Sequence, residues 1–273
     1  MERYKAVEES IVTAFRETLW EKFTAGVEQY ALIQDGDKIA VCVSGGKDSM
    51  LTAKCVQMLQ RLGKPRFDAV FLVMNPGYND INRQTVTDNA QLLHLPIHMF
   101  ETRIFDIVAG TDRSPCYLCA KMRRGYLYGK ARELGCNKIA LGHHFDDVVE
   151  TTLMSMLYSG EVKTMMPKLH SANFGGMELI RPIYAVKEAD ILRWKSANDL
   201  TFIQCACRFT ENCAFGGSGG GTKREEMKTL IKRLRRLDSR IDENIFESTH
   251  NVALDSVIGY RDRAGRHCFL DAY

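Results

Sequence analysis

The sequence SGGKDS at residues 44–49 decides the fold, because it joins a buried strand to a helix. The apolar run KIAVCV at residues 38–43 precedes it directly, and an apolar series with helical spacing follows and ends at Gly63. Adjacent glycines let the backbone turn tightly and approach a ligand, and the amide groups that open the helix point toward an anion. The stretch is therefore predicted to bind phosphate through Ser44, Gly45, Gly46, Lys47, Asp48 and Ser49.

The alternative for this stretch is a plain glycine-rich turn that Ser and Asp side chains cap. A Gly-Gly pair alone would fit that interpretation, but the whole string between a strand and a helix favours a phosphate site. In such a site Lys47 supplies a positive charge, and Asp48 accepts from loop amides or helps to hold Mg²⁺. The spacing of the other common phosphate loop, G-x-x-x-x-G-K-[ST], is absent.

Strands alternate with helices on both sides of this loop. Buried strands are predicted at residues 38–43, 68–74, 96–101 and 137–141, and helices at residues 79–93, 115–134 and 146–158. This alternation indicates an α/β fold with a doubly wound parallel sheet. Because ligands of such sheets bind at the carboxyl ends of the strands, the chemistry is expected just after Val43, Met74, Glu101 and Leu141.

Three parts are predicted along the chain. Residues 1–30 form a helical segment with apolar side chains at four-residue spacing, residues 31–185 form the α/β domain, and residues 186–273 form a helical, cysteine-containing extension. Helices are expected in this extension at residues 187–198 and 223–237. The run GGSGGG at residues 216–221 resembles a linker, natural or engineered, and receives no functional weight.

Composition excludes several classes of protein. The chain has 273 residues, 45% hydrophobic and 26% charged, with a net charge of +3, which is ordinary for a globular protein. It contains no apolar run of roughly 18 residues and its start lacks a signal-peptide core, so we expect a cytoplasmic protein without a membrane span. Nine cysteines, an odd number, favour metal or sulfur chemistry over disulfides.

Two of these cysteines form a C-x-x-C motif, Cys116 and Cys119, at the predicted start of a helix. The positive end of a helix lowers the pKa of a thiol, so this pair suits a redox dithiol, half of a zinc site or part of an iron–sulfur site. The extension offers further ligands in Cys205, Cys207 and Cys213. Two ligands plus one would leave an iron open to bind sulfur, whereas two plus two would indicate zinc. Core packing or an exposed position is the better interpretation for Cys42, Cys55, Cys136 and Cys268.

A second polar string, LGHHFDD at residues 141–147, follows the fourth predicted strand. Asp146 and Asp147 at a strand end beside a phosphate loop can hold Mg²⁺ or orient the nucleotide and the attacking group. The alternatives are a charged helix start for the aspartates and capping or packing for the histidines. The position of the whole string favours a site that includes Gly142 and His143.

Six strings occur in an order that resembles the tRNA 2-thiocytidine synthetase family of PP-loop ATP pyrophosphatases. The resemblance covers residues 20–215. The strings are SGGKDS (44–49), PCYLCAKMRRG (115–125), LGHHFDDVVET (141–151), MPKL (166–169), LIRP (179–182) and FIQC (202–205).

The resemblance implies a cytoplasmic enzyme that cleaves ATP between the α- and β-phosphates and adenylates a tRNA cytidine. It implies a [4Fe-4S] cluster held by Cys116, Cys119 and Cys205, and a basic residue, here Arg123, near the reacting base. The reaction also needs a sulfur donor, such as a desulfurase persulfide or sulfide. Mg²⁺, held by the acidic residues named above, and a homodimer are further expectations. Where the family shows a second C-x-x-C, this chain has Cys205-Ala206-Cys207 and then Cys213, so the third ligand is open among the three.

Other functions remain as alternatives. A uridine thiolase shares the plan of three cysteines, a cluster-free synthetase would use an amine nucleophile, and a nucleotide-sensing domain would release no pyrophosphate. Catalytic roles are assigned to Lys47, Arg123, Asp146 and Asp147.

Residues 223–240 carry eight basic side chains against three acidic ones. A basic helix there would suit RNA phosphates, with Arg235 and Arg236 as the expected contacts. The alternative is a solvated helix face.

Overall fold

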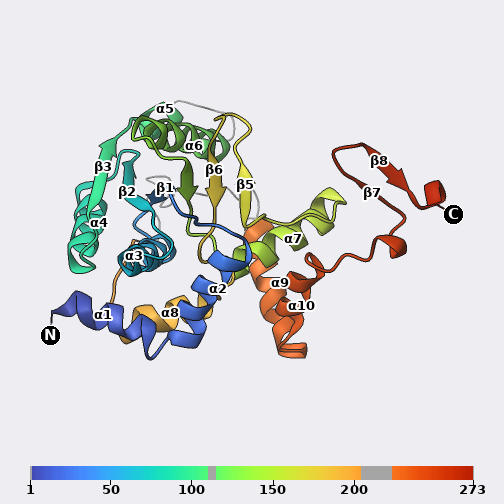
Figure 1. Cartoon of the computed structure of the whole chain (residues 1–273), viewed down its shortest axis with the longest axis horizontal. Helices are drawn as coiled ribbons and strands as arrows, with labels where there is room; N and C mark the ends of the chain where they lie inside the picture. Colours follow the sequence, from blue (N-terminus) through green and yellow to red (C-terminus); the bar gives the residue numbers. More distant parts are fainter. Residues whose placement is uncertain (1, 110–114, 204–222, 273) are drawn as a thin grey trace. The chain divides into compact units, whose positions relative to one another are not determined.

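The computed structural model describes residues 2–109, 115–203 and 223–272 (Figure 1). The chain divides into two compact units. The first comprises residues 1–147 and 166–220, and the second comprises residues 148–165 and 221–273. These two units have other boundaries than the three parts expected from the sequence. The three parts stay a prediction.

The first unit is built around a six-stranded sheet with the strand order β3-β2-β1-β4-β6-β5. The strands are β1 (Lys38–Cys42), β2 (Asp68–Asn75), β3 (Ile97–Glu101), β4 (Lys138–Ala140), β5 (Lys168–His170) and β6 (Glu178–Ile180). All neighbouring strands are parallel except β5, which pairs with β6 in antiparallel register. The predicted doubly wound α/β fold is confirmed.

Alternate residues of β1 belong to two different cores, as a sheet covered on both faces requires. Ile39 and Val41 are buried in the larger core, to which helices α3 (Lys47–Leu62), α4 (Asp80–Leu92) and α8 (Glu188–Ala197) contribute. Ala40 and Cys42 are buried in a smaller core with Tyr128 of helix α6 (Pro115–Glu133). Helix α5 (Ile104–Ala109) lies between β3 and α6 in the chain.

The N-terminal helix differs from its prediction, because it is interrupted. Helix α1 (Arg3–Val12) ends where the backbone amide of Phe15 donates to the carbonyl of Ser10, and a π-helical turn (Arg16–Trp20) leads into α2 (Glu21–Gln29). A π-turn inserts an extra residue and rotates the following face. With this rotation Leu19 and Phe23 are both fully buried, and Phe15 is only partly buried.

The second unit contains the C-terminal part of α7 (Phe145–Ser159) together with α9 (Lys223–Leu237) and α10 (Ile241–Ser248). Its buried apolar side chains include Met227 and Ile231 of α9 and Phe246 of α10, together with Val148 and Val149 of α7. The expected helix at residues 223–237 is confirmed. Helix α10 and a short hairpin of β7 (Gly259–Arg261) and β8 (Arg266–Cys268) were not predicted.

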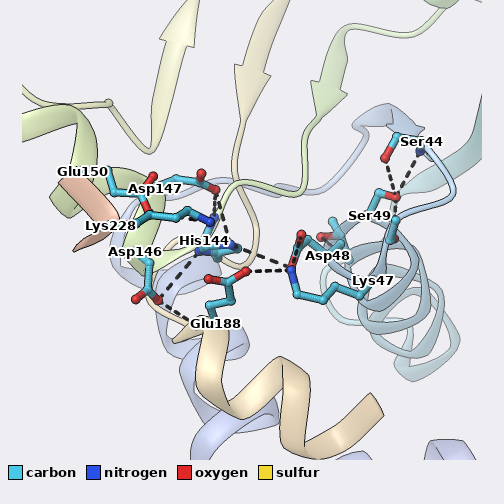
Figure 2. Close-up of polar contacts among 12 residues, drawn as sticks. Ser44, Lys47, Asp48, Ser49, His144, Asp146, Asp147, Glu150, Glu188 and Lys228 are labelled. Carbon is cyan, nitrogen blue, oxygen red and sulfur yellow. Dashed lines mark hydrogen bonds and ion pairs between the residues drawn. The ribbon is translucent and has the colours of Figure 1, made fainter. Parts of the chain in front are cut away.

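Two buried carboxylates hold α9 within this unit. Glu150, which is 2% exposed, lies 3.2 Å from Arg224. It also lies 3.9 Å from Lys228 (Figure 2). Asp242 accepts from Arg235 at 2.7 and 2.9 Å. Three of the basic residues expected at an RNA surface therefore have partners inside the protein. Among the described helices, none has the length and apolar character needed to cross a membrane.

Candidate nucleotide site and its cysteine motif

The phosphate loop joins β1 to α3 as predicted. Ser49 fixes its shape, because its hydroxyl donates to the carbonyl of Gly46 at 2.9 Å and accepts from the backbone amide and the hydroxyl of Ser44, both at 3.0 Å. Gly45 has a φ of +87°, and a Cβ there would lie 2.5 Å from a methyl carbon of Val86. The first glycine is thus required by both backbone conformation and space.

The second string lies directly against the phosphate loop. A Cβ on Gly142 would lie 2.9 Å from the amide nitrogen of Ser49 and 3.0 Å from the carbonyl of Asp48. Only glycine permits this approach, since these neighbours are backbone atoms that no rotamer change can move. The two strings, almost a hundred residues apart, therefore form one site at the carboxyl ends of β1 and β4.

A cavity of about 210 Å³ opens where the two strings meet. Several of the predicted site residues line it, from both strings and from α6; they are Ser44, Asp48, Ser49, Arg123, Gly142 and His143. Cys42, at the end of β1, also lines it, and burial raises the pKa of this thiol to about 12 even though Arg123 opposes the shift. Cys42 is therefore a neutral thiol in the cavity wall.

Lys47 turns toward helix α8 (Figure 2). Its ammonium lies 2.8 Å from Glu188 and 3.1 Å from Asp48. Burial opposes the charge of Lys47, but the field of Asp48 and the hydrogen bond to Glu188 outweigh burial and raise its pKa. The lysine is thus a stable cation, held at the edge of the loop by two carboxylates.

The two predicted catalytic aspartates also accept hydrogen bonds from helix ends. Asp146 accepts from the backbone amide of Glu188 at 2.7 Å, at the first turn of α8, and Asp147 accepts from the backbone amide of His144 at 3.1 Å. Both contacts are helix-capping interactions. Asp146 connects the start of α7 to the start of α8, Asp147 caps its own helix, and neither lines the cavity that Asp48 lines.

His144 lies among three carboxylates (Figure 2). Its Nε2 is 3.8 Å from Asp48 and 3.6 Å from Asp147, and its Nδ1 is 3.9 Å from Asp146. The Asp48 oxygen that faces it, Oδ1, is buried and has no hydrogen-bond partner among the described residues. A buried carboxylate oxygen without a hydrogen-bond partner is a suitable ligand for a hard cation such as Mg²⁺.

The C-x-x-C motif opens helix α6, as predicted from Pro115. Cys119 is partly buried and packs against the larger core. The three candidates for a third ligand, Cys205, Cys207 and Cys213, lie outside the described residues. Within the described part of the chain no group of three metal-binding side chains is assembled.

The PP-loop domain family matches residues 16–207 of the chain. A "tRNA-cytidine(32) 2-sulfurtransferase" from Geobacter metallireducens is 32% identical over 229 residues, which are 83% of this chain and 86% of that protein. A protein of the same name from Pelobacter propionicus is 34% identical over 83% of this chain and 82% of its own length.

The chain belongs to this PP-loop sulfurtransferase family. Its relatives are transferases, so it is an enzyme of that class. Among solved structures, the U34-tRNA thiolase NcsA from Methanococcus maripaludis, described with its [4Fe-4S] cluster, shares the fold with a TM-score of 0.66 and 18% identity. The match covers 89% of this chain and 80% of that one.

Sequence reasoning missed two residues of this PP-loop site and assigned no role to His144 beyond capping or packing. Glu188 and Arg181 come from regions without an expected ligand. Glu188 binds Lys47, and Arg181 donates to His143 at 3.3 Å. The LIRP string contains Arg181, so its presence in the resemblance was the only available signal.

Proposed function

We propose that the protein is an ATP-dependent tRNA sulfurtransferase that converts a cytidine of tRNA to 2-thiocytidine. The main support is the close contact of the two PP-loop strings at Gly142, which places a phosphate loop, Arg123 and His143 around one cavity. The C2 oxygen of the base would attack the α-phosphate of ATP and release pyrophosphate. Sulfur would then add at C2, and AMP would leave with the oxygen.

In the first step the phosphate loop binds ATP through its backbone amides and the Ser44 and Ser49 hydroxyls. Lys47 provides positive charge at the edge of the loop, and Asp48 holds Mg²⁺ through the oxygen that faces His144. Arg123 projects from α6 into the same cavity, where it would stabilise the charge that develops as pyrophosphate leaves. Asp146 holds the start of α8, and with it Glu188, beside these groups, and Asp147 caps the string that contains His143.

For the second step, we assign Cys116, Cys119 and Cys205 as ligands of a [4Fe-4S] cluster. Two thiols at the first turn of α6 fit this role, because thiolates are the ligands that iron–sulfur clusters use and a helix start favours the thiolate. A cluster with three cysteine ligands supplies an open iron at which a sulfur atom can bind. The sulfur would come from sulfide, or from a persulfide together with a thiol reductant, which is oxidised to a disulfide and supplies the two electrons that bring the outer sulfur to the sulfide level.

The tRNA is expected to contact the outer face of α9 in the second unit. Because Arg224, Lys228 and Arg235 pair with buried carboxylates, Arg235 is not available as an RNA contact. Lys232, Arg233, Arg236 and Arg240 are exposed. They replace the expected Arg235–Arg236 pair as the phosphate-binding set. The assignment of the reaction to the cytoplasm rests on family resemblance alone, and the homodimer stays an expectation.

The function is tested by the nucleosides of tRNA. The purified protein, with iron and sulfide reconstituted anaerobically, is incubated with ATP, a sulfur donor and tRNA from a deletion strain, and the nucleosides are identified by mass spectrometry. We expect 2-thiocytidine and equimolar AMP from the wild type, and neither product from Asp48→Ala. Thiouridine instead would reassign the base, and AMP without any thionucleoside would reject sulfur transfer.

The tRNA surface is tested separately by affinity. Replacing Lys232, Arg233 and Arg236 with Gln should weaken tRNA binding and lower the slope of log affinity against log salt by about 2 to 3, since each phosphate contact releases counterions. The matched control replaces Lys22, Lys64 and Arg132, which are exposed cations of the first unit. Equal losses in both triple variants would show only a general charge effect.

A further inference from the structure

Arg181 connects three strings of the sequence that are far apart in the chain. It follows β6 directly and lies in LIRP. Its backbone amide donates to Pro167 at 3.0 Å, and its guanidinium donates to the carbonyl of Met166, both in MPKL. Its Nε donates to Nδ1 of His143, in LGHH, at 3.3 Å.

The environment of Arg181 is unusual for a cation. Its side chain is buried, with the residue 8% exposed, and the two acceptors described for its guanidinium are a carbonyl oxygen and an imidazole nitrogen, both uncharged. Burial lowers the pKa of Arg181 to about 10, although the charge of Asp147 opposes the shift, and Arg181 stays protonated at neutral pH. A buried charge carries a large desolvation penalty, so it persists only where its hydrogen bonds matter.

The hydrogen bond to His143 determines where the proton of that imidazole resides. A neutral imidazole has one donor nitrogen and one acceptor nitrogen, so a ring that accepts at Nδ1 carries its hydrogen on Nε2. His143 lines the cavity beside Ser44 and Ser49.

We propose that Arg181 is a positioning residue that fixes His143 as the neutral Nε2–H tautomer, so that His143 donates a hydrogen bond to a phosphate oxygen of the bound nucleotide. This inference rests on the proposed function for the identity of the ligand. It gives the site a directional donor without adding a cation to Lys47 and Arg123. It also gives a physical reason for MPKL and LIRP, which contain no residue that lines the cavity.

The tautomer is measured directly by NMR. Protein with ¹⁵N-labelled histidine gives separate ring patterns for the two neutral tautomers and the protonated form, and His143→Gln identifies the signal of His143 among the seven histidines. We expect the Nε2–H pattern in the wild type and a mixture in Arg181→Gln. An Nδ1–H pattern in the wild type, or the same single pattern in Arg181→Gln, would overturn the proposal. This measurement requires neither ATP nor tRNA.

A double-mutant cycle on ATP affinity separates positioning from simple structural support. The amide NH₂ of Gln can replace the Nε2–H donor, so His143→Gln should weaken ATP binding less than His143→Ala, whereas His143→Ala and Arg181→Gln should each weaken binding about tenfold. In the His143→Gln background, Arg181→Gln should have little further effect. An equal tenfold loss in that background would mean that Arg181 only supports the Met166 segment, and the proposal would be wrong.

Two controls keep the result interpretable. Thermal unfolding of each variant shows whether it folds, and Arg181→Lys, which keeps a buried cation but loses the Nε donor, replaces Arg181→Gln if that variant does not. Arg181→Lys should again mix the tautomers and weaken ATP binding. If ATP binding and tautomers behave as expected while no tRNA is thiolated, the proposed function fails and this inference stands.

Discussion

The ammonium of Lys47 lies 2.8 Å from a carboxylate oxygen of Glu188, a residue 141 positions further along the chain. Glu188 is also the residue through which Asp146 binds the start of α8, at 2.7 Å. One acidic residue therefore links the lysine of the phosphate loop to an aspartate of the second PP-loop string. The Lys47 side chain is 20% exposed and the Glu188 side chain 26% exposed, so solvent reaches the pair only in part.

Glu188→Gln is expected to tighten ATP binding. The carboxylates of Asp48 and Glu188 neutralise Lys47, so the phosphates of ATP must compete with them for its ammonium group. Removing one competitor should lower the dissociation constant for ATP roughly two- to tenfold, measured by calorimetry. Asp190→Asn is the matched control, because it makes the same charge change in the same helix but pairs with Arg193. Weaker binding in Glu188→Gln would mean that Glu188 holds Lys47 in its nucleotide-bound position.

Gly142→Ala is expected to separate the two strings of the site. The added methyl group meets the backbone of Asp48 and Ser49 at 3.0 Å or less, so the phosphate loop or the second string must shift. We expect a loss of about 1 to 3 kcal/mol in the free energy of unfolding and a large fall in AMP formation. Gly129→Ala in helix α6 is the control, since its Cβ meets open space and should stabilise the helix slightly. Unchanged activity in Gly142→Ala would show that the close approach has no functional importance.

Arg235 and Arg236 are neighbours on α9 with opposite expected effects. Arg235→Ala removes both nitrogens that contact Oδ2 of the buried Asp242 carboxylate and should lower the free energy of unfolding by about 2 kcal/mol. Arg236→Ala should change stability by less than about 0.5 kcal/mol, because Arg236 is exposed. Urea unfolding gives both values. Equal stabilities would contradict the ion pair, whereas tRNA affinity should fall only through Arg236.

Cys205→Ala is expected to lose the visible absorbance of the cluster and the thiolation activity, while some AMP formation persists. The reason is that Cys116 and Cys119 alone cannot complete a cluster site. Iron and sulfide are quantified after anaerobic reconstitution, with Cys213→Ala as the control that should keep the cluster. If Cys207→Ala or Cys213→Ala loses iron and Cys205→Ala retains it, the third ligand has been misassigned. Zinc in place of iron would reject the cluster.

The buried thiols should resist alkylation. Burial raises the pKa values of Cys42 and Cys55 to about 12, so at pH 8 almost none of either thiol is in the reactive thiolate form. Iodoacetamide should modify the exposed Cys268 in the native protein and spare these two, as peptide mapping can show. Rapid modification of Cys42 would indicate that the reagent enters the cavity and that burial does not keep this thiol in its unreactive neutral form.

The sequence was sufficient for elements whose signal is local. The strand that ends before the phosphate loop, and helix α3 ending at Gly63, were predicted almost to the residue, because a continuous apolar run and a left-handed glycine define them. The three-residue strands β5 and β6 carry too few residues to show a period, so they were missed. The interruption between α1 and α2 was missed because Phe15, Leu19 and Phe23 keep regular spacing across a turn that is not regular.

Site residues that lie within a sequence motif could be predicted. Isolated residues that only the tertiary packing brings to the site could not. Ser44, Asp48, Arg123 and His143 were expected at the site and line one cavity. Glu188 resembles any acidic residue at a helix start, and only the packing of α8 beside α3 directs it toward Lys47. Arg235 shows the opposite case, since its partner Asp242 lies in a helix that the sequence did not indicate.

The strand order of the sheet has a consequence for synthesis on the ribosome. Ile39 of β1 pairs with Ala69 on one side but with Lys138 on the other, so the second edge of this central strand stays bare while almost a hundred further residues are added. At ordinary rates of translation this takes roughly 5 to 20 s. Glu188 emerges later still. A nascent chain therefore exposes an unpaired, apolar strand beside an incomplete phosphate loop. The complete nucleotide site can form only after the last third of the chain has begun to emerge from the ribosome.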